Sequence, residues 1–219
     1  MARGTTFGTL HSDRDLNLIQ QHVEVEPAQP KTNYIDIPGA DGSKDMTEAL
    51  GVGVKYKDRA ITWTFALYPG DNWSNRQRLV SNALNGKACD IILDEDPEYY
   101  YKGRLAVSNH KSDGMLKQIT VKAVCRPYKL KQQPTTVSRD DLTANYKALT
   151  LENDRKPAVP SITVSAETTL SFNGNTYTVG PGEHVLPEIQ LAEGVNTLKA
   201  KLTAAESGSI SVAYQEGAL

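Results

Sequence analysis

The sequence predicts a mainly β protein with two domains, and three observations support this fold class. Apolar and polar residues alternate with period two in several runs of the first half. One helical stripe of apolar residues interrupts these runs. Shorter alternating runs follow in the second half, roughly a dozen residues apart, which is typical of an antiparallel sandwich. We therefore expect an N-terminal β-sandwich or barrel-like domain with one α-helix, followed by a C-terminal antiparallel β-sandwich.

Three strands of the first half are predicted by their alternation. The apolar face of ITWTFAL, residues 61–67, consists of Ile61, Trp63, Phe65 and Leu67. The matching faces of YYYKGRLAV and KQITVKAVC consist of Tyr99, Tyr101, Leu105 and Val107, and of Ile119, Val121, Ala123 and Cys125. Each run therefore predicts a strand with one face in a core.

The helix is predicted over NWSNRQRLVSNALNGK, residues 72–87. Its apolar stripe consists of Trp73, Leu79, Val80, Ala83 and Leu84. Asn72 or Ser74 can cap the start, and Gly86 can end the helix in a left-handed conformation. A helix with one such stripe is expected to pack on a β-sheet.

A domain boundary is predicted where the alternation stops. Residues 126–142 lose periodicity and gain proline and charge, so we place a linker within 126–145, between domains of residues 1–130 and 131–219. After it, PSITV, TTLSF, NTYTV, NTLKAKL and GSISVAY are predicted strands. Asn173-Gly174 predicts a tight hairpin between two of them.

The composition of the chain excludes several classes of function. Lys plus Arg number 24 and Asp plus Glu 26, so a net charge of −2 gives no field that attracts nucleic acid or anionic lipid. No apolar run of 18 residues and no signal-peptide core are present, and we expect a protein that is made and kept soluble in a cytoplasm. Cys89 and Cys125 lie in strand-like runs, which favours two buried free thiols over a disulfide or a metal pair.

The stretch DIPGADGSKDMTEALG, residues 36–51, resembles a ligand loop in composition but fails the tests for one. A P-loop needs a Gly-Lys pair, and the stretch has none. Counted from Asp41, an EF-hand loop would have its glycine at Met46 and its glutamate at Val52. We therefore expect neither phosphate nor calcium to bind there.

A structural interpretation accounts for more of this stretch. Pro38-Gly39 and Asp41-Gly42 predict successive turns. Asp45 and Glu48 form a predicted capping pair that opens a short helical turn, which Gly51 ends. The glycines are then needed for positive φ angles rather than for a ligand.

Other candidate sites also favour a structural role. DEDPEYY, residues 94–100, predicts a solvated hairpin tip, because Asp96-Pro97 is a turn signal. The four histidines, His11, His22, His110 and His184, lack metal-binding spacing and are expected at the surface or in turns. No nucleophile elbow, dinucleotide fingerprint or C-x-x-C pair is present, so no residue supports an enzyme.

A carbohydrate-binding or adhesin module is the alternative function that the residues leave open. Such sandwiches carry aromatic platforms, but Trp63 and Trp73 lie at predicted core positions of the first half. In the second half, Phe172, Tyr177 and Tyr214 alternate with apolar strand neighbours and are also expected in the core.

The order of phrases along the chain resembles one family. FGTLHSDRDLNLI, KTNYIDIPGADGSKDMTEALG, YKDRAITWTFAL, LNGKACDIILDEDPEYYYKGRL and ITVKAVCRPYKL resemble the N-terminal domain of the distal tail (Dit) proteins of long-tailed, siphovirus-type phages and prophages. NDRKPAVPSITV, FNGNTYTVGPGEHVLPEIQLAEGVNTLKAKL and YQEGAL resemble their C-terminal galectin-like sandwich. The resemblance covers nearly the whole chain.

This resemblance implies a structural baseplate hub in the virion, without a cofactor or catalytic residues. Six copies would form a ring, or two rings back to back, between the tail tube protein and the tail-tip or tail-associated protein. Tape measure and receptor-binding proteins are further implied partners, no membrane is involved, and assembly would take place in the host cytoplasm. DNA would pass through the lumen without specific binding, and we expect a neutral to negative inner surface.

The family signature maps onto turn and packing positions of this sequence. The Pro-Gly-x-Asp-Gly turn and its continuation fall on Pro38, Gly39, Asp41, Gly42, Asp45, Thr47 and Glu48. The remaining signature positions are Arg59, Trp63, Phe65, Tyr101, Gly103, Arg104, Pro127 and Tyr128.

Two departures from the family limit what the second domain is expected to do. It has no insertion long enough for an extra carbohydrate-binding module, and it lacks the His, Asn, Arg and Trp cluster of the galectin sugar site. We therefore expect it to carry other proteins rather than to bind a receptor. For ring closure, we hypothesise that the N-terminal segment or the hairpin at residues 94–98 reaches a neighbouring copy.

Overall fold

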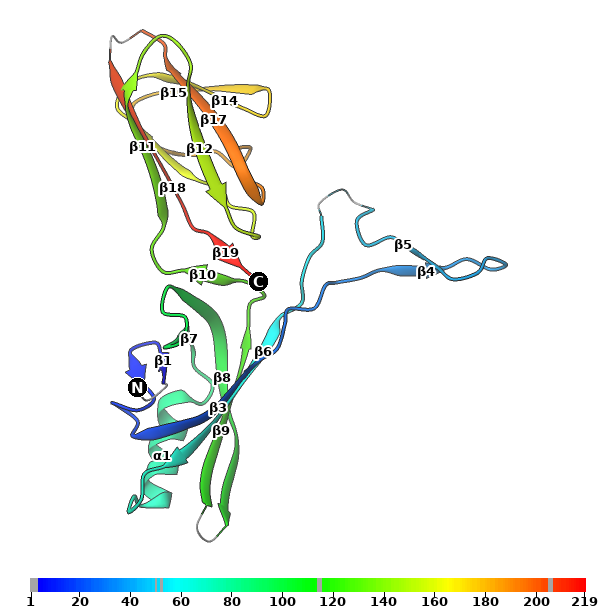
Figure 1. The fold of residues 1–219 in the computed structure, drawn as a ribbon, viewed down its shortest axis with the longest axis vertical. Coiled ribbons are helices and arrows are strands. Elements are labelled where there is room, and N and C mark those ends of the chain that lie inside the picture. Colours follow the sequence, from blue (N-terminus) through cyan, green and yellow to red (C-terminus); the bar gives the residue numbers. More distant parts are fainter. Residues whose placement is uncertain (1–3, 50, 52, 114–115, 205–206) are drawn as a thin grey trace. The chain divides into compact units, whose positions relative to one another are not determined.

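The structure, a computed structural model, describes the chain except residues 1–3, 50, 52, 114–115 and 205–206. It is mainly β, as predicted, and α1 (Trp73–Leu84) is the single helix of the described part. The chain divides into two compact units, unit 1 (Met1–Lys129) and unit 2 (Leu130–Leu219), with the division inside β10 (Lys129–Lys131) (Figure 1).

Unit 1 is built on one antiparallel sheet, which we call the main sheet. Its strand order is β2–β1–β7–β8–β9–β6–β3. The strands are β1 (Thr5–Phe7), β2 (Leu10–His11), β3 (Leu18–Val25), β6 (Arg59–Leu67), β7 (Ala88–Leu93), β8 (Tyr99–Asp113) and β9 (Leu116–Cys125). The three strands predicted from alternation are thus β6, β8 and β9, which lie side by side.

The core of unit 1 lies on one face of the main sheet. Along β6, every second residue is buried, and the Trp63 and Phe65 side chains are fully buried. The Phe7 ring packs edge-on against both, with ring centroids 5.1 Å and 6.3 Å away. Burying large apolar side chains contributes about 1.5–3 kcal/mol each, so this face stabilises the unit.

Helix α1 closes this core. The Asn72 side-chain oxygen accepts a hydrogen bond from the Asn75 amide (3.1 Å), which caps the first turn. Val80 and Leu84 are buried in the core, and Gly86 follows the helix with a positive φ of 78°. The prediction that Leu79 widens the stripe is wrong, because Leu79 is 43% exposed while the row through Val80 and Leu84 packs on the sheet.

The opposite face of the main sheet is largely exposed. Its outward-pointing residues include Lys102 and Arg104 on β8, and Lys122 and Val124 on β9. Val124 is 61% exposed although its strand is central in the sheet. Within the described residues of unit 1, no strand or helix therefore buries this face.

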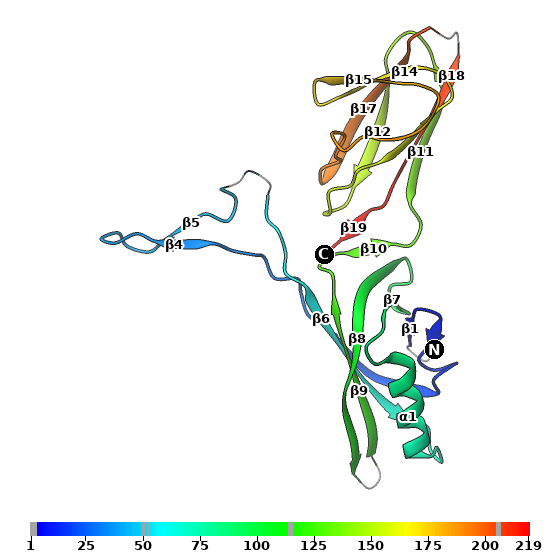
Figure 2. The ribbon, with the colours of Figure 1, turned by 180° about the vertical axis from the view of Figure 1, so that it is seen from behind.

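Between β3 and β6 the chain makes a long excursion, residues 26–58, which we call the arm. Its far part is a hairpin of β4 (Tyr34–Asp36) and β5 (Ser43–Asp45), which pair with each other and not with the main sheet. Figures 1 and 2 show this hairpin lying away from the main sheet of unit 1. Nearer the sheet, the two limbs are joined by a bridge between Pro30 and Tyr56.

Unit 2 is an antiparallel sandwich, as predicted. Its two sheets have the orders β11–β18–β13–β16 and β12–β17–β14–β15. The strands are β11 (Thr135–Leu142), β12 (Lys147–Asn153), β13 (Ser161–Val164), β14 (Thr168–Phe172), β15 (Asn175–Val179), β16 (Gly182–Val185), β17 (Gly194–Leu202) and β18 (Gly208–Tyr214); β19 (Gly217–Ala218) pairs with β10. Inward-facing residues of both sheets form one core.

The hairpin between β14 and β15 and the strand β11 can be compared with the predictions for unit 2. The hairpin prediction is confirmed, since Asn173 and Gly174 have φ angles of 48° and 84° between β14 and β15. Within the region 126–145, where we placed the linker, residues 135–142 form β11 along β18, a strand that the sequence analysis did not predict. This strand alternates mostly threonine, serine and charged residues, and Leu142 is its one buried residue, so its apolar signal is weak.

Gly103 occupies a position where a larger residue does not fit. A Cβ atom there would lie 2.5 Å from Cys125 Sγ and 3.0 Å from the Val124 carbonyl oxygen. We expect Gly103→Ala to lower the free energy of unfolding by about 1–3 kcal/mol through overpacking, as measured by urea denaturation. Gly180→Ala is the matched control, because the space around that glycine is open. Equal stability of the Gly103→Ala variant and the unchanged protein would contradict this packing.

Candidate interaction surfaces

The glycine-rich stretch of residues 36–51 forms the end of the arm. The Ala40 amide donates to the Ile37 carbonyl oxygen (3.1 Å), which places Pro38 and Gly39 at the centre of a turn. Gly39 and Gly42 have positive φ angles of 85° and 73°, which glycine adopts without strain. The stretch is thus the turn of a hairpin.

The local structure after this hairpin differs from the predicted one. The Asp45 carboxylate accepts a hydrogen bond from the Thr47 amide (2.9 Å), two residues on, rather than pairing with Glu48. Two turns follow, from Met46 to Ala49 and from Glu48 to Gly51, so the expected short turn forms without the predicted capping pair. The reason is that Asp45 ends β5 in an extended conformation, from which an aspartate readily bonds the amide two residues on.

The hairpin has two chemically different faces. Cross-strand partners share a face, so Tyr34 lies with Asp45, and Asp36 lies with Ser43. The Ser43 hydroxyl donates to Asp36 Oδ1 (2.5 Å). We call these four residues the acidic face of the arm. Ile35 pairs with Lys44 on the other face.

The arm exposes several apolar side chains. Tyr34, Ile35 and Ile37 are 59%, 48% and 47% exposed. None of the described residues from 26 to 58 is buried. An isolated two-stranded hairpin is only marginally stable in water, so a surface of this kind is typical of a segment that packs against another molecule.

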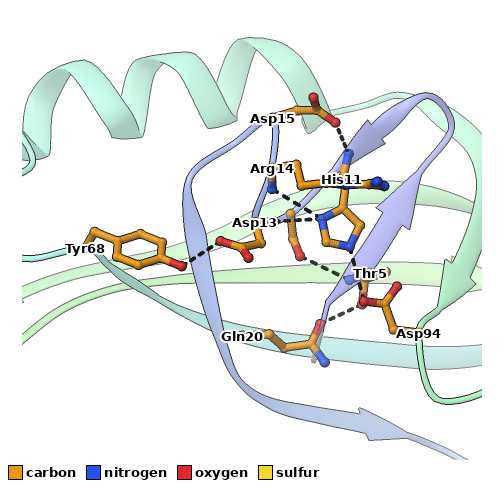
Figure 3. A network of polar contacts seen from close by, with 9 residues as sticks. Thr5, His11, Asp13, Arg14, Asp15, Gln20, Tyr68 and Asp94 are labelled. Atoms are coloured by element: carbon orange, nitrogen blue, oxygen red, sulfur yellow. Dashed lines mark hydrogen bonds and ion pairs between the residues drawn. The ribbon is translucent and has the colours of Figure 1, made fainter. Parts of the chain in front are cut away.

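His11 lies at the centre of a polar network, shown in Figure 3, and is a buried residue of β2 rather than the surface or turn histidine that we predicted. Its side chain is 9% exposed and contacts Asp94 Oδ2 through Nε2 (3.2 Å). The amides of Asp13 and Arg14 donate to Nδ1 (3.2 and 3.3 Å), so the ring proton lies on Nε2. The Asp15 carboxylate accepts from the His11 amide (2.6 Å).

The groups at the centre of this network are engaged with one another. Both ring nitrogens of His11 are engaged, and the nearby Ser12 hydroxyl accepts a hydrogen bond from the Thr5 amide (3.1 Å). A general base needs an open nitrogen within reach of a substrate. The network instead holds the N-terminal turn of unit 1 against the segment that contains Asp94.

The segment of residues 94–98 is held in place at two points. Asp94 contacts His11, and Asp96 Oδ2 accepts from Lys129 Nζ (2.6 Å). The prediction of a solvated hairpin tip is confirmed, because residues 94–98 form the turn between β7 and β8 and four of the five are exposed. Asp94 and Asp96 nevertheless have partners within unit 1. Of the other histidines, His22 is exposed, His184 Nε2 lies 2.7 Å from the Gly180 carbonyl oxygen, and the side chain of His110 lies outside the described residues.

The two cysteines are free, and they flank Gly103 across neighbouring strands. Cys89 on β7 and Cys125 on β9 are both register partners of Gly103 on β8. Cys125 is 1% exposed, and burial raises the pKa of its thiol to about 12. Cys89 is half-buried rather than buried as expected, and burial raises its pKa as well.

The other signature residues are distributed over unit 1. Arg59 is 5% exposed, and its guanidinium lies 5.7 Å from the ring centroid of Tyr101. Arg104 donates to the Gly86 carbonyl oxygen (2.6 Å), and the Tyr128 ring packs edge-on on Tyr56 (5.8 Å). Pro127 precedes Tyr128 in a bend after β9. Trp63, Tyr101 and Gly103 thus lie in the body of unit 1, whereas positions 38–48 lie on the arm.

Sequence reasoning missed the exposed apolar residues of the arm and the burial of His11. A signal for the arm was present, because Tyr34, Ile35 and Ile37 precede a Pro-Gly turn. In the second half, Phe172 and Tyr214 are each 3% exposed, so they do not form an aromatic platform.

Two further observations concern the described residues. They contain no group of three or more His, Cys, Asp or Glu side chains that could hold a metal ion. Within the same part of the chain, no helix is long and apolar enough to cross a membrane.

The thiols give a direct test of this packing. Because the thiolate is the reactive form, a raised pKa and burial should protect Cys125 from alkylation. We expect iodoacetamide at pH 8 to leave Cys125 unmodified in the native protein, to modify Cys89 slowly, and to modify both thiols in urea, as measured by mass spectrometry. Rapid native modification of Cys125 would contradict the assigned burial.

Comparison with known proteins identifies a solved structure with a similar fold. No family model matches the sequence, and no curated protein matches it. Among solved structures, the chain is similar to SPP1 Dit (gp 19.1), a protein described as a paradigm of the hub adsorption apparatus in phages that infect Gram-positive bacteria. The match covers 100% of both chains with a TM-score of 0.68 and 15% identity. The protein therefore has the fold of SPP1 Dit over its whole length.

Proposed function

We propose that this protein is a distal tail protein, a structural hub at the end of a phage tail. The observation that carries the proposal is the end-to-end similarity of its fold to SPP1 Dit, because both units are matched rather than one common sandwich. The family-like order of sequence phrases, from FGTLHSDRDLNLI to YQEGAL, supports the same function independently of the fold.

In this proposal, six copies close into a ring through unit 1. A ring of identical chains needs two different complementary faces on each copy. The arm supplies a candidate for one face, because its hairpin exposes Tyr34, Ile35 and Ile37 and contacts no core. This replaces the hairpin at residues 94–98 as the connecting segment, since Asp94 and Asp96 are engaged within unit 1.

The ring would connect the tail tube protein to the tail-tip protein in the virion. Unit 2, a galectin-like sandwich in this proposal, would carry adsorption proteins, and its buried Phe172 and Tyr214 favour a scaffold over a sugar-binding module. DNA would pass through the lumen unbound, which agrees with a net charge of −2. Function would depend on interfaces and not on catalysis.

The oligomeric state tests the proposal. Size-exclusion chromatography with light scattering should give six times the 24.0 kDa mass of the monomer, or twelve times for back-to-back rings. A clean monomer that binds to a glycan array would instead favour the carbohydrate-binding alternative.

Removal of the hairpin tests the role of the arm. The Met46 amide donates to the Asn33 carbonyl oxygen (2.7 Å), so a Gly-Ser linker can replace residues 34–45 without straining the limbs. We expect this variant to keep the melting temperature of the unchanged protein and to lose the ring in light scattering. Val195→Lys is the control, because Val195 is a 69% exposed apolar residue on β17 of unit 2 and should leave the ring intact.

Rings that persist without the hairpin would contradict a role of the arm in ring closure. The proposed hub function would then need another contact surface on unit 1.

A further inference from the structure

The two cysteines and Gly103 form a row across three neighbouring strands of the main sheet. Cys89 on β7 and Cys125 on β9 are both register partners of Gly103 on β8, and cross-strand partners share a face of the sheet. A Cβ atom at Gly103 would lie 2.5 Å from Cys125 Sγ, so this sulfur atom already lies over the glycine. Because Gly103 adds no side chain to the row, the space above it is left to the two thiols.

The two thiols can approach each other, but the strand spacing does not allow a disulfide. Strands lie about 4.8 Å apart, so the Cα atoms of Cys89 and Cys125 are about 10 Å from each other across β8. A disulfide needs Cα atoms within about 7 Å. Two sulfur atoms bonded in line to one metal ion are farther apart than those of a disulfide, about 4.6 Å, because each metal–sulfur bond is about 2.3 Å long.

This larger distance suits the row. The Cβ atom of Cys89 lies about 5 Å from the position of a Gly103 Cβ atom, since directly opposed residues have that spacing. A Cys89 side chain turned toward Gly103 therefore brings its sulfur within bridging range of Cys125 Sγ. Cys89 is half-buried, so an ion can reach the pair from its side.

Arg59 places a buried positive charge beside the row. It is the register partner of Cys125 on β6 and is 5% exposed. Its Nε atom has no hydrogen-bond partner among the described residues, and the neighbouring Asp58 lines a recess on the opposite face of the sheet. Burial raises the pKa of the Cys125 thiol, and the charge of Arg59 acts in the opposite direction. A buried cation of this kind favours an anion beside it.

We propose that Cys89 and Cys125 bind one soft monovalent metal ion, of the copper(I) class, between their sulfur atoms. Thiolate sulfur is the ligand that such ions select. Each thiol releases its proton to water and forms one sulfur–metal bond, so the complex carries one net negative charge. Arg59 supplies the countercharge, and the ion connects β7 to β9 across Gly103.

The number of ligands decides the class of metal. A structural zinc ion needs four ligands, and the described residues contain no group of three or more His, Cys, Asp or Glu side chains. The two thiols alone complete the coordination of a two-coordinate ion. This inference does not depend on the proposed hub function, because the row lies within unit 1 of a single chain.

Silver(I) is the probe for this site, because it is a soft monovalent ion that is stable in air. In chloride-free buffer, we expect native mass spectrometry to show one silver ion per chain, and X-ray absorption to show two sulfur neighbours of the metal. Bound silver should block the alkylation of Cys89 by iodoacetamide and should raise the melting temperature, because the unfolded chain does not hold the two thiols together. Zinc under the same conditions should not bind.

Substitutions in the row test the ligands and the countercharge. Because the second thiol binds intramolecularly, Cys89→Ser should weaken silver binding by about 10²–10⁴-fold. Arg59→Met should weaken it by removing the countercharge, and Arg59→Lys should weaken it less. His22→Ala is the control, because it removes an exposed metal-binding side chain on β3 and should leave silver binding unchanged. Melting temperatures without silver report whether each variant folds.

The outcomes decide between a metal site and two unconnected thiols. Silver binding by Cys89→Ser that is as tight as in the unchanged protein, a single sulfur neighbour of the metal, or loss of binding in His22→Ala would overturn the site. None of these results bears on the number of copies in the assembly, which tests the hub function separately.

Discussion

The architecture of unit 1 depends on burying one face of the main sheet and leaving the other exposed. Strand β6 sets this arrangement, because Trp63 and Phe65 are buried on the same side and alternate with the partly exposed Thr62 and Thr64. A register slip of one residue would reverse the two faces. Helix α1 covers the buried face through Val80 and Leu84. The opposite face then remains available for contact with another molecule.

The arm, by contrast, gains little stabilisation from burial within its own chain. It leaves the main sheet after β3 and returns at β6, so its ends are fixed, while none of the described residues between them is buried. Ordering a backbone costs about 1–2 kcal/mol per residue, and the hairpin recovers little of this within its own chain. Contacts in an assembly would supply the missing stabilisation. The proposed function supplies such contacts, because it places this chain in an assembly of identical copies.

Sequence patterns predicted the strongly periodic parts of the fold. Strands β6, β8 and β9, helix α1 and the Asn173-Gly174 hairpin all follow local rules of alternation, capping and turn chemistry. Strand β11 escaped prediction because its outward residues are threonine, serine and aspartate, and its pairing with β18 is a long-range contact. His11 appeared isolated because its partner Asp94 is distant in sequence. Candidate surfaces were the least predictable part, since exposure of Tyr34 or Val124 depends on what the rest of the chain leaves uncovered.

The central claim is that identical copies of this chain form the hub of a phage tail. Negative-stain electron microscopy of the purified protein tests it most directly, because class averages report both closure and symmetry. The account predicts closed particles with sixfold symmetry and an open central channel. Open chains of copies, closed particles of another symmetry or single isolated molecules would contradict it.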